Sequence, residues 1–226
     1  MKSTGVLAVL ILSTAVLQAG ESAPSRLTEA AEVFGEIMGT PDKGIPQDLL
    51  EKAQCVGIVP GLKKGAFLVG GEFGKGFVQC RKPGGAGWSA PAAVRVEGGS
   101  VGLQIGGSST DVVMLVMNQR GMDKLMTDKF TLGADASVAA GPVGRTANAK
   151  TDAYMTAEIL AWSRSKGLFA GISLSGATLR NDLDGNKELY GSRLTNKEVL
   201  AGDRPAPEAA KKLIEELDKY SMRKSN

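Results

Sequence analysis

The chain has 226 residues, of which 42% are hydrophobic and 23% charged, with a net charge of +3. This composition is that of one globular domain with a well-buried core, and the weak net charge argues against a nucleic-acid partner, which needs a concentrated basic surface. The chain contains no histidine, which excludes Ser-His-Asp and Cys-His nucleophile systems, HExxH metal sites and His-containing zinc sites.

The first residues have the pattern of a signal peptide. Lys2 supplies a positive charge, residues 5–16 form an apolar run, and Ala19 offers a small residue for cleavage. We therefore predict a signal peptide over residues 1–19, a single domain over residues 20–226, and a secreted or periplasmic location. The alternative is that the apolar run is a buried first helix.

Two helices are predicted next. Apolar residues at helical spacing predict a helix over residues 25–38 that is capped by Ser25. Pro46 fits the first turn of a short helix that follows. The polar face of the first helix carries Glu29, Glu32 and Glu36. An interfacial helix on anionic lipid should be basic, so we expect this helix to pack on the sheet instead.

The rest of the chain reads mainly as strands. Alternating apolar and polar residues predict strands at 56–59, 66–70, 76–80, 92–97, 101–105, 111–117, 136–140, 157–163 and 168–175. Turns are predicted at 60–61, 70–76, 82–87 and 98–99. Further helices are predicted at 119–126, 195–200 and 207–220. The predicted fold is α+β: a curled or closed, mostly antiparallel, barrel-like sheet with N- and C-terminal helices.

Two glycine-rich pieces carry the most information. They are TLGADASVAAGPVGR (131–145) and SRSKGLFAGISLSGATL (163–179). Each glycine in a strand costs folding entropy, so a chain that keeps this many needs tight backbone curvature or close backbone approach.

These pieces, with others, resemble the SYLF domain of lipid-binding proteins. The resemblance covers about residues 53–191, and its segments occur in order along the chain. The further segments are GWSAPAAVR (87–95), GLQIGGSSTDVVMLVM (102–117), SKGLFAGISLSGATL (165–179) and NKELYG (186–191). The resemblance implies a lipid-binding module, with phosphoinositides as ligands in eukaryotic relatives and actin contact in some; it does not imply an enzyme.

Basic residues at predicted turns are the candidate lipid contacts. Lys63 and Lys64 lie in PGLKKG, Lys75 in GGEFGKG, and Arg81 with Lys82 follows the next strand. Such groups attract lipid phosphate at about 1 kcal/mol each near an anionic membrane. The alternative is that these side chains are solvated and only keep the protein soluble.

The two cysteines, Cys55 and Cys80, lie near the ends of two predicted strands. An even pair in an exported chain suggests a disulfide, and neighbouring strands could meet its distance requirement. Two buried free thiols are the alternative.

We therefore predict an exported, non-enzymatic module without a cofactor that binds a lipid or membrane surface, recognising anionic or phosphoinositide-like lipids through its basic turns. The alternative function is an envelope module that binds a protein partner or is structural. An enzyme that uses Asp111, Asp135 or Asp152 has little support, because isolated Asp residues at strand ends usually accept hydrogen bonds from backbone N–H groups.

Overall fold

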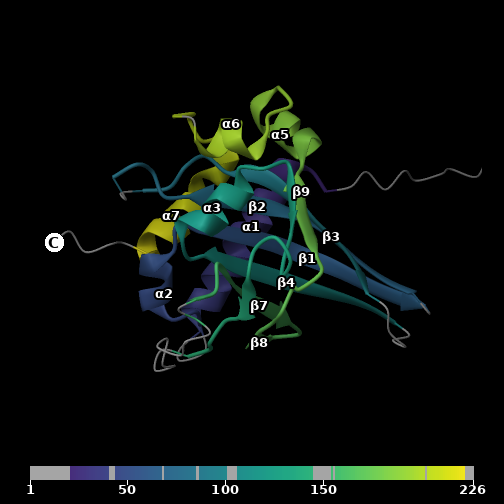
Figure 1. Cartoon of the computed structure of the whole chain (residues 1–226). Helices are drawn as coiled ribbons and strands as arrows, with labels where there is room; N and C mark the ends of the chain where they lie inside the picture. Colours follow the sequence, from purple (N-terminus) through teal and green to yellow (C-terminus); the bar gives the residue numbers. More distant parts are fainter. Residues whose placement is uncertain are drawn as a thin grey trace, which may run out of the picture.

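The computed structural model describes residues 21–40, 44–67, 69–84, 87–100, 106–144, 154, 156–201 and 203–221. The predicted signal peptide (1–19) and the predicted strand at 101–105 lie outside these residues. The α+β class is confirmed: the sheet curls into a half-barrel, with helices from both ends of the chain packed beside it (Figure 1).

The helices are α1 (Ala23–Gly39), α2 (Gln47–Lys52), α3 (Gln119–Leu125), α5 (Leu183–Tyr190), α6 (Asn196–Leu200), the 3-10 turn η1 (Glu208–Ala210) and α7 (Lys211–Ser221). The strands are β1 (Cys55–Phe67), β2 (Val69–Cys80), β3 (Ala92–Ser100), β4 (Gly106–Val116), β5 (Lys129–Thr131), β6 (Val138–Ala140), β7 (Ile159–Ser165), β8 (Leu168–Gly171) and β9 (Thr178–Asn181).

The nine strands form one sheet in the order β5-β9-β3-β2-β1-β4-β7-β6, with β8 paired to β7. Among the strand pairs of the described residues only β6–β7 is parallel, which confirms a mostly antiparallel sheet. Within the described residues β5 and β6 lie at opposite ends of this order, so the sheet is curled rather than closed. The long strands β1 to β4 form its centre and extend beyond the helices (Figure 1).

Three predicted turns are wrong, because the strands run straight through them. Pro60–Gly61 lies inside β1, residues 70–76 inside β2, and residues 98–99 inside β3. The pairing of β1 with both neighbours shifts register around Gly61, whose φ is +55°. This is a bulge, a place where proline and glycine are tolerated within a sheet. Lys63, Lys64 and Lys75 are therefore strand residues and not turn residues.

Both faces of the sheet are buried. On one face, α1 presents an unbroken apolar side that includes Leu27 and Phe34, and it packs with Leu213 and Leu217 of α7 over the central strands. The inner face of the half-barrel holds a second core, closed by side chains that include Leu125 and Leu200. The predicted packing of the first helix on the sheet is confirmed, and it explains why α1 is apolar along one side and acidic along the other.

The ends of the helices are set by local polar contacts. The Ser22 side chain accepts a hydrogen bond from the backbone N–H of Ser25, so the cap of α1 lies three residues before the predicted one. Thr195 and Glu198 form a reciprocal capping box at the start of α6, where the helix was predicted. The helix α5 begins directly after Asp182 and is capped at its end by Gly191, whose φ of +76° suits a glycine at the end of a helix.

Candidate functional site

The structure divides four of the five predicted lipid contacts between two places, and Lys64 lines neither of them. Lys63 and Lys75 border a cleft beside α1, whereas Arg81 and Lys82 border a groove at the other end of β2. Lys75 and Arg81 are six positions apart along an extended strand, so their Cα atoms are separated by about 20 Å. The five residues therefore do not form one cluster.

Three of the five are held by neighbouring groups. Lys64 Nζ lies 2.9 Å from Glu72 Oε2, and Lys75 Nζ lies 3.1 Å from Asp182 Oδ2. Arg81 donates hydrogen bonds to backbone carbonyl oxygens at 3.3 Å in α2 and 2.6 Å at the end of α7, and its guanidinium stacks over the Trp88 ring at 4.1 Å. Arg81 thus ties two helices to the sheet.

The groove beside Arg81 has a volume of about 910 Å³, and we call it the Arg204 groove. Its lining residues are Gln54, Cys80, Arg81, Lys82, Pro83, Gly84, Ser89, Ala90, Met122, Met126, Leu200, Ala201, Asp203 and Arg204. The size is that of a ligand-binding pocket. Methionine and leucine side chains supply its apolar surface, and Lys82 and Arg204 are exposed cations at its border.

Residues within or just beyond three elements, β2, α3 and α6, form much of the Arg204 groove. The methionines come from α3 and the residue that follows it, Leu200 ends α6, and the basic residues lie just after β2 and α6. A disulfide joins Cys55 to Cys80 across the paired ends of β1 and β2, so the structure contains the predicted bond at the groove wall. The Cys80 backbone N–H also donates to Ser89 Oγ at 3.0 Å. These contacts fix the strand end from which Lys82 projects.

Arg204 was missed at the sequence level, since no local pattern marks it. Its guanidinium lies 5.6 Å from the centre of the Tyr190 ring. Burial raises the pKa of Tyr190 far above its ordinary value, and the hydroxyl donates to the Pro91 carbonyl oxygen at 2.6 Å. The ring therefore stays neutral at physiological pH and offers Arg204 a cation–π contact.

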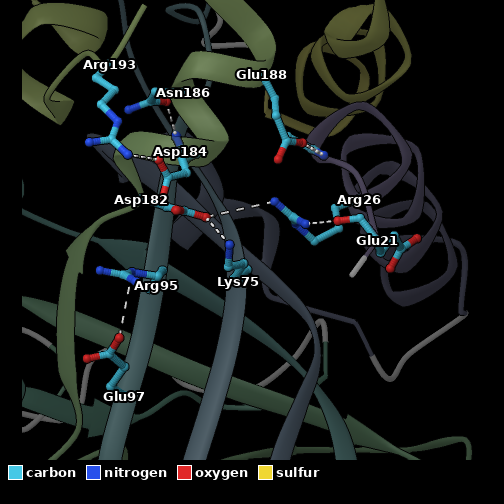
Figure 2. Close-up of polar contacts among 12 residues, drawn as sticks. Glu21, Arg26, Lys75, Arg95, Glu97, Asp182, Asp184, Asn186, Glu188 and Arg193 are labelled. Atoms are coloured by element: carbon cyan, nitrogen blue, oxygen red, sulfur yellow. Dashed lines mark hydrogen bonds and ion pairs between the residues drawn. The ribbon is translucent and has the colours of Figure 1, made fainter. Parts of the chain in front are cut away.

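A buried carboxylate organises the second place (Figure 2). Asp182 is 2% exposed and lies between Lys75 of β2 and Arg26 of α1, whose Nη2 is 3.9 Å from Asp182 Oδ2. The Lys75 contact is an ion pair without the geometry of a hydrogen bond. Asp182 was not among the predicted site residues, because its partners lie more than a hundred residues earlier in the chain.

Beside this carboxylate is a cleft of about 580 Å³ between α1 and the strands β1 and β2, which we call the α1 cleft. Its lining residues are Glu21, Arg26, Glu29, Pro60, Gly61, Lys63, Phe73, Gly74, Lys75, Ser109 and Glu188. Glu188 accepts a hydrogen bond from the backbone N–H of Ala23 at 2.6 Å, where the positive end of the α1 dipole favours an anion. Burial, and then the nearby Glu21, raise the pKa of Glu29.

No group of three or more metal-ligating side chains is present in the part of the chain that the structure describes. No helix among the same residues has the length and apolar content to cross a membrane. What the fold offers is a curled half-barrel with one basic, partly apolar groove and one cleft of mixed charge. These features fit the binding module that the resemblance to the SYLF domain implies.

Comparison with known proteins agrees with that class. Residues 97–220, more than half of the chain, match the family described as "Ysc84: Las17-binding protein actin regulator". The chain belongs to this Ysc84 (SYLF) family, as the sequence resemblance predicted.

Curated relatives show the same similarity over a longer stretch. The human "SH3 domain-containing YSC84-like protein 1" is 34% identical over 208 residues, which cover 89% of this chain and 60% of the relative. The Saccharomyces cerevisiae "LAS seventeen-binding protein 3" is 36% identical over 200 residues, covering 86% of this chain and 42% of the relative. The chain thus spans roughly two to three fifths of the length of these relatives.

The comparisons correct one prediction. The matched relatives are actin-regulating and SH3-domain proteins of yeast and human, and these are not secreted. The predicted secreted or periplasmic location is therefore wrong. That prediction rested on Lys2, the apolar run at residues 5–16 and Ala19, and all of these lie outside the described residues.

Proposed function

We propose that the chain is a non-enzymatic module that binds an anionic lipid surface through the Arg204 groove. The observation that carries this proposal is the composition of the groove: Met122, Met126 and Leu200 supply apolar surface beside the exposed cations Lys82 and Arg204. An anionic lipid combines the same two chemistries, a charged headgroup and an apolar chain.

The charges at the groove border favour this site over the other basic residues. Lys64 and Lys75 already face carboxylates, so a lipid phosphate would have to compete with Glu72 and Asp182. Arg204 instead rests on a neutral ring, and among the described residues no ion pair joins Arg204 or Lys82 to a carboxylate, although Glu198 and Asp203 lie near Arg204. Each cation near an anionic membrane contributes about 1 kcal/mol, so two cations suffice for a measurable effect.

Vesicle flotation tests the proposal. The chain is mixed with phosphatidylcholine vesicles that contain phosphatidylserine or a phosphoinositide, and with phosphatidylcholine vesicles alone, at low salt. The double variant Lys82→Ala/Arg204→Ala should lower binding to the anionic vesicles about tenfold or more, since it removes two of these cations.

The control is Lys64→Ala/Lys212→Ala, which removes the same charge from two cations that pair with carboxylates and line neither the Arg204 groove nor the α1 cleft. It should bind anionic vesicles like the unchanged chain. The proposal is wrong if the two double variants lose binding equally, or if the unchanged chain binds none of the anionic vesicles.

A protein partner is the second candidate function, and the description of the family as an actin regulator favours it. Cosedimentation of the chain with filamentous actin tests it directly. Binding that survives Lys82→Ala/Arg204→Ala would place the actin contact outside the Arg204 groove, and no sedimentation above the level of bovine albumin would count against this candidate.

A further inference from the structure

The α1 cleft has opposite charges on its two walls. Its carboxylates come from the helical side: Glu21 precedes α1, Glu29 lies on α1, and Glu188 lies on α5. Two of its cations, Lys63 and Lys75, come from the sheet side. The cleft therefore separates positive from negative charge across its width.

These facing charges do not neutralise one another directly. Among the described residues, no ion pair joins Lys63 to any carboxylate, and none joins Glu29 to a cation. Lys75 pairs with Asp182, which is not among the residues that line the cleft. A space remains in which a ligand can contact both walls.

A buried donor in the cleft also lacks a partner. Arg26, the third lining cation, is 8% exposed, and its Nε–H has no hydrogen-bond partner among the described residues. Figure 2 shows its guanidinium between Glu21 and Asp182. A buried unpaired donor costs free energy, which an acceptor group entering the cleft would recover.

We propose that the α1 cleft binds a zwitterionic phosphate–ammonium group of the phosphoethanolamine type. The phosphate contacts Lys63 and accepts from the unpartnered Arg26 Nε–H, and the ammonium contacts Glu21 and Glu29. The three lining carboxylates balance the three lining cations, so a neutral dipolar ligand fits better than an anion or a cation alone. A primary ammonium fits better than a quaternary one, because carboxylates accept hydrogen bonds from N–H donors.

This inference goes beyond the proposed function and does not depend on it. The Arg204 groove lies at the other end of β2 and offers only an anion site with apolar surface. The α1 cleft adds recognition of a neutral headgroup, which could be presented on a lipid or carried by a small soluble molecule.

Calorimetric titration of the full chain with glycerophosphoethanolamine tests the site. We expect saturable binding, with weaker binding of glycerophosphocholine and no saturation by inorganic phosphate or ethanolamine alone. Glu29→Gln and Lys63→Ala should each weaken binding about tenfold, the size expected for the loss of one charged hydrogen bond.

Two neighbouring residues provide matched controls. Glu32→Gln alters a carboxylate one turn along α1 that pairs with Lys212, and Lys64→Ala alters a cation next to Lys63 that pairs with Glu72. Both should bind glycerophosphoethanolamine like the unchanged chain. Lys82→Ala/Arg204→Ala should do so too, which separates this site from the Arg204 groove.

Flotation with vesicles that contain phosphatidylethanolamine, compared with vesicles of phosphatidylcholine alone, shows whether the phosphate–ammonium group comes from a lipid or from a soluble molecule. Preferential flotation points to a lipid headgroup, and titration without flotation points to a soluble ligand; both support the proposed chemistry. The proposal is overturned if glycerophosphoethanolamine does not bind, if phosphate alone saturates equally, or if Glu29→Gln and Lys63→Ala bind normally.

Discussion

At the scale of single residues, Asp182 joins three parts of the fold. Its side chain faces Lys75 of β2 and Arg26 of α1, and its backbone N–H donates to the Ala93 carbonyl oxygen of β3 at 2.9 Å. One helix and two strands therefore meet at this buried residue. Removing its charge would leave two cations together in a place where little water can screen them.

We predict that Asp182→Asn lowers the free energy of unfolding by about 2–3 kcal/mol. This loss is smaller than the largest losses seen when a fully buried ion pair is broken, because Lys75 is partly exposed. Urea unfolding followed by circular dichroism measures this. The matched control is Asp184→Asn, which breaks an exposed pair with Arg193 and should change stability by less than about 1 kcal/mol. Equal effects of the two substitutions would contradict the central role of Asp182.

Glu29 gives a prediction with a pH dependence. Its pKa is raised in the folded protein by burial and by Glu21, so the unfolded chain releases this proton more readily. As pH rises from the ordinary value of 4.5 through the raised pKa, ionisation of Glu29 increasingly opposes folding. Glu29→Gln should therefore raise the melting temperature at pH 7 and have no such effect below pH 4.5.

Thermal unfolding of both proteins at several pH values measures that difference. Glu32→Gln serves as the control, because Glu32 pairs with Lys212 and its removal should not stabilise the protein at pH 7. A stabilisation by Glu29→Gln that is independent of pH would show that ionisation is not its cause. If the gain is found, residue 29 keeps an unfavourable charge that the α1 cleft would use for binding.

At the scale of elements, the glycines of β1 and β2 serve close packing in the sheet. A Cβ on Gly76 would lie 2.1 Å from the Ile58 carbonyl oxygen and 2.7 Å from the Val59 Cα. Gly65, in β1, has open space around its position. The two positions look alike in the sequence, although only one of them requires glycine.

Gly76→Ala should therefore cost about 3 kcal/mol or more, because a backbone oxygen cannot move aside as a flexible side chain can. Gly65→Ala should stay within about 1 kcal/mol of the unchanged chain. Soluble yield and urea unfolding of the two variants provide the comparison. A Gly76→Ala protein of normal stability would show that β1 and β2 are not packed as closely as the structure has them.

Elements could be predicted where a local sequence pattern defines them, and not where contacts between distant residues do. Helices with an apolar face, such as α1 and α7, are visible from spacing alone, and Thr195 with Glu198 marks the start of α6. The lengths of β1 and β2 were underestimated, because glycine in a strand was interpreted as a turn. The contact between Gly76 and Ile58 is made across two strands, and no local window contains it.

At the scale of the whole molecule, the candidate sites were also predictable only where neighbours in the sequence define them. Arg81 and Lys82 were predicted from their place after a strand, and they do border the Arg204 groove. Arg204 and Asp182 were missed, because their roles depend on Tyr190 and Lys75, which the folded chain brings to them. Local charge patterns could identify individual cations, but only the tertiary arrangement could group them into two sites.

The order of the strands also bears on where the folding unit begins. The family match covers residues 97–220, whereas β1 and β2 lie in the middle of the sheet, between β3 and β4. A fragment limited to the match would keep β9 and β5 on one side and β4, β7 and β6 on the other, with nothing to join them. It would also lack α1, whose Leu27 and Phe34 are fully buried.

We therefore predict that a 97–220 fragment does not fold alone, whereas a 21–221 fragment does. The shorter chain should show poorly dispersed amide signals by NMR and no cooperative thermal transition, because it exposes both cores and two unpaired strand edges. The longer chain should give dispersed signals and a single transition. A cooperative transition in the 97–220 fragment would contradict this prediction. It would mean that the remaining strands can form a stable sheet without β1 and β2, which would then supply residues to the two sites without being needed for folding.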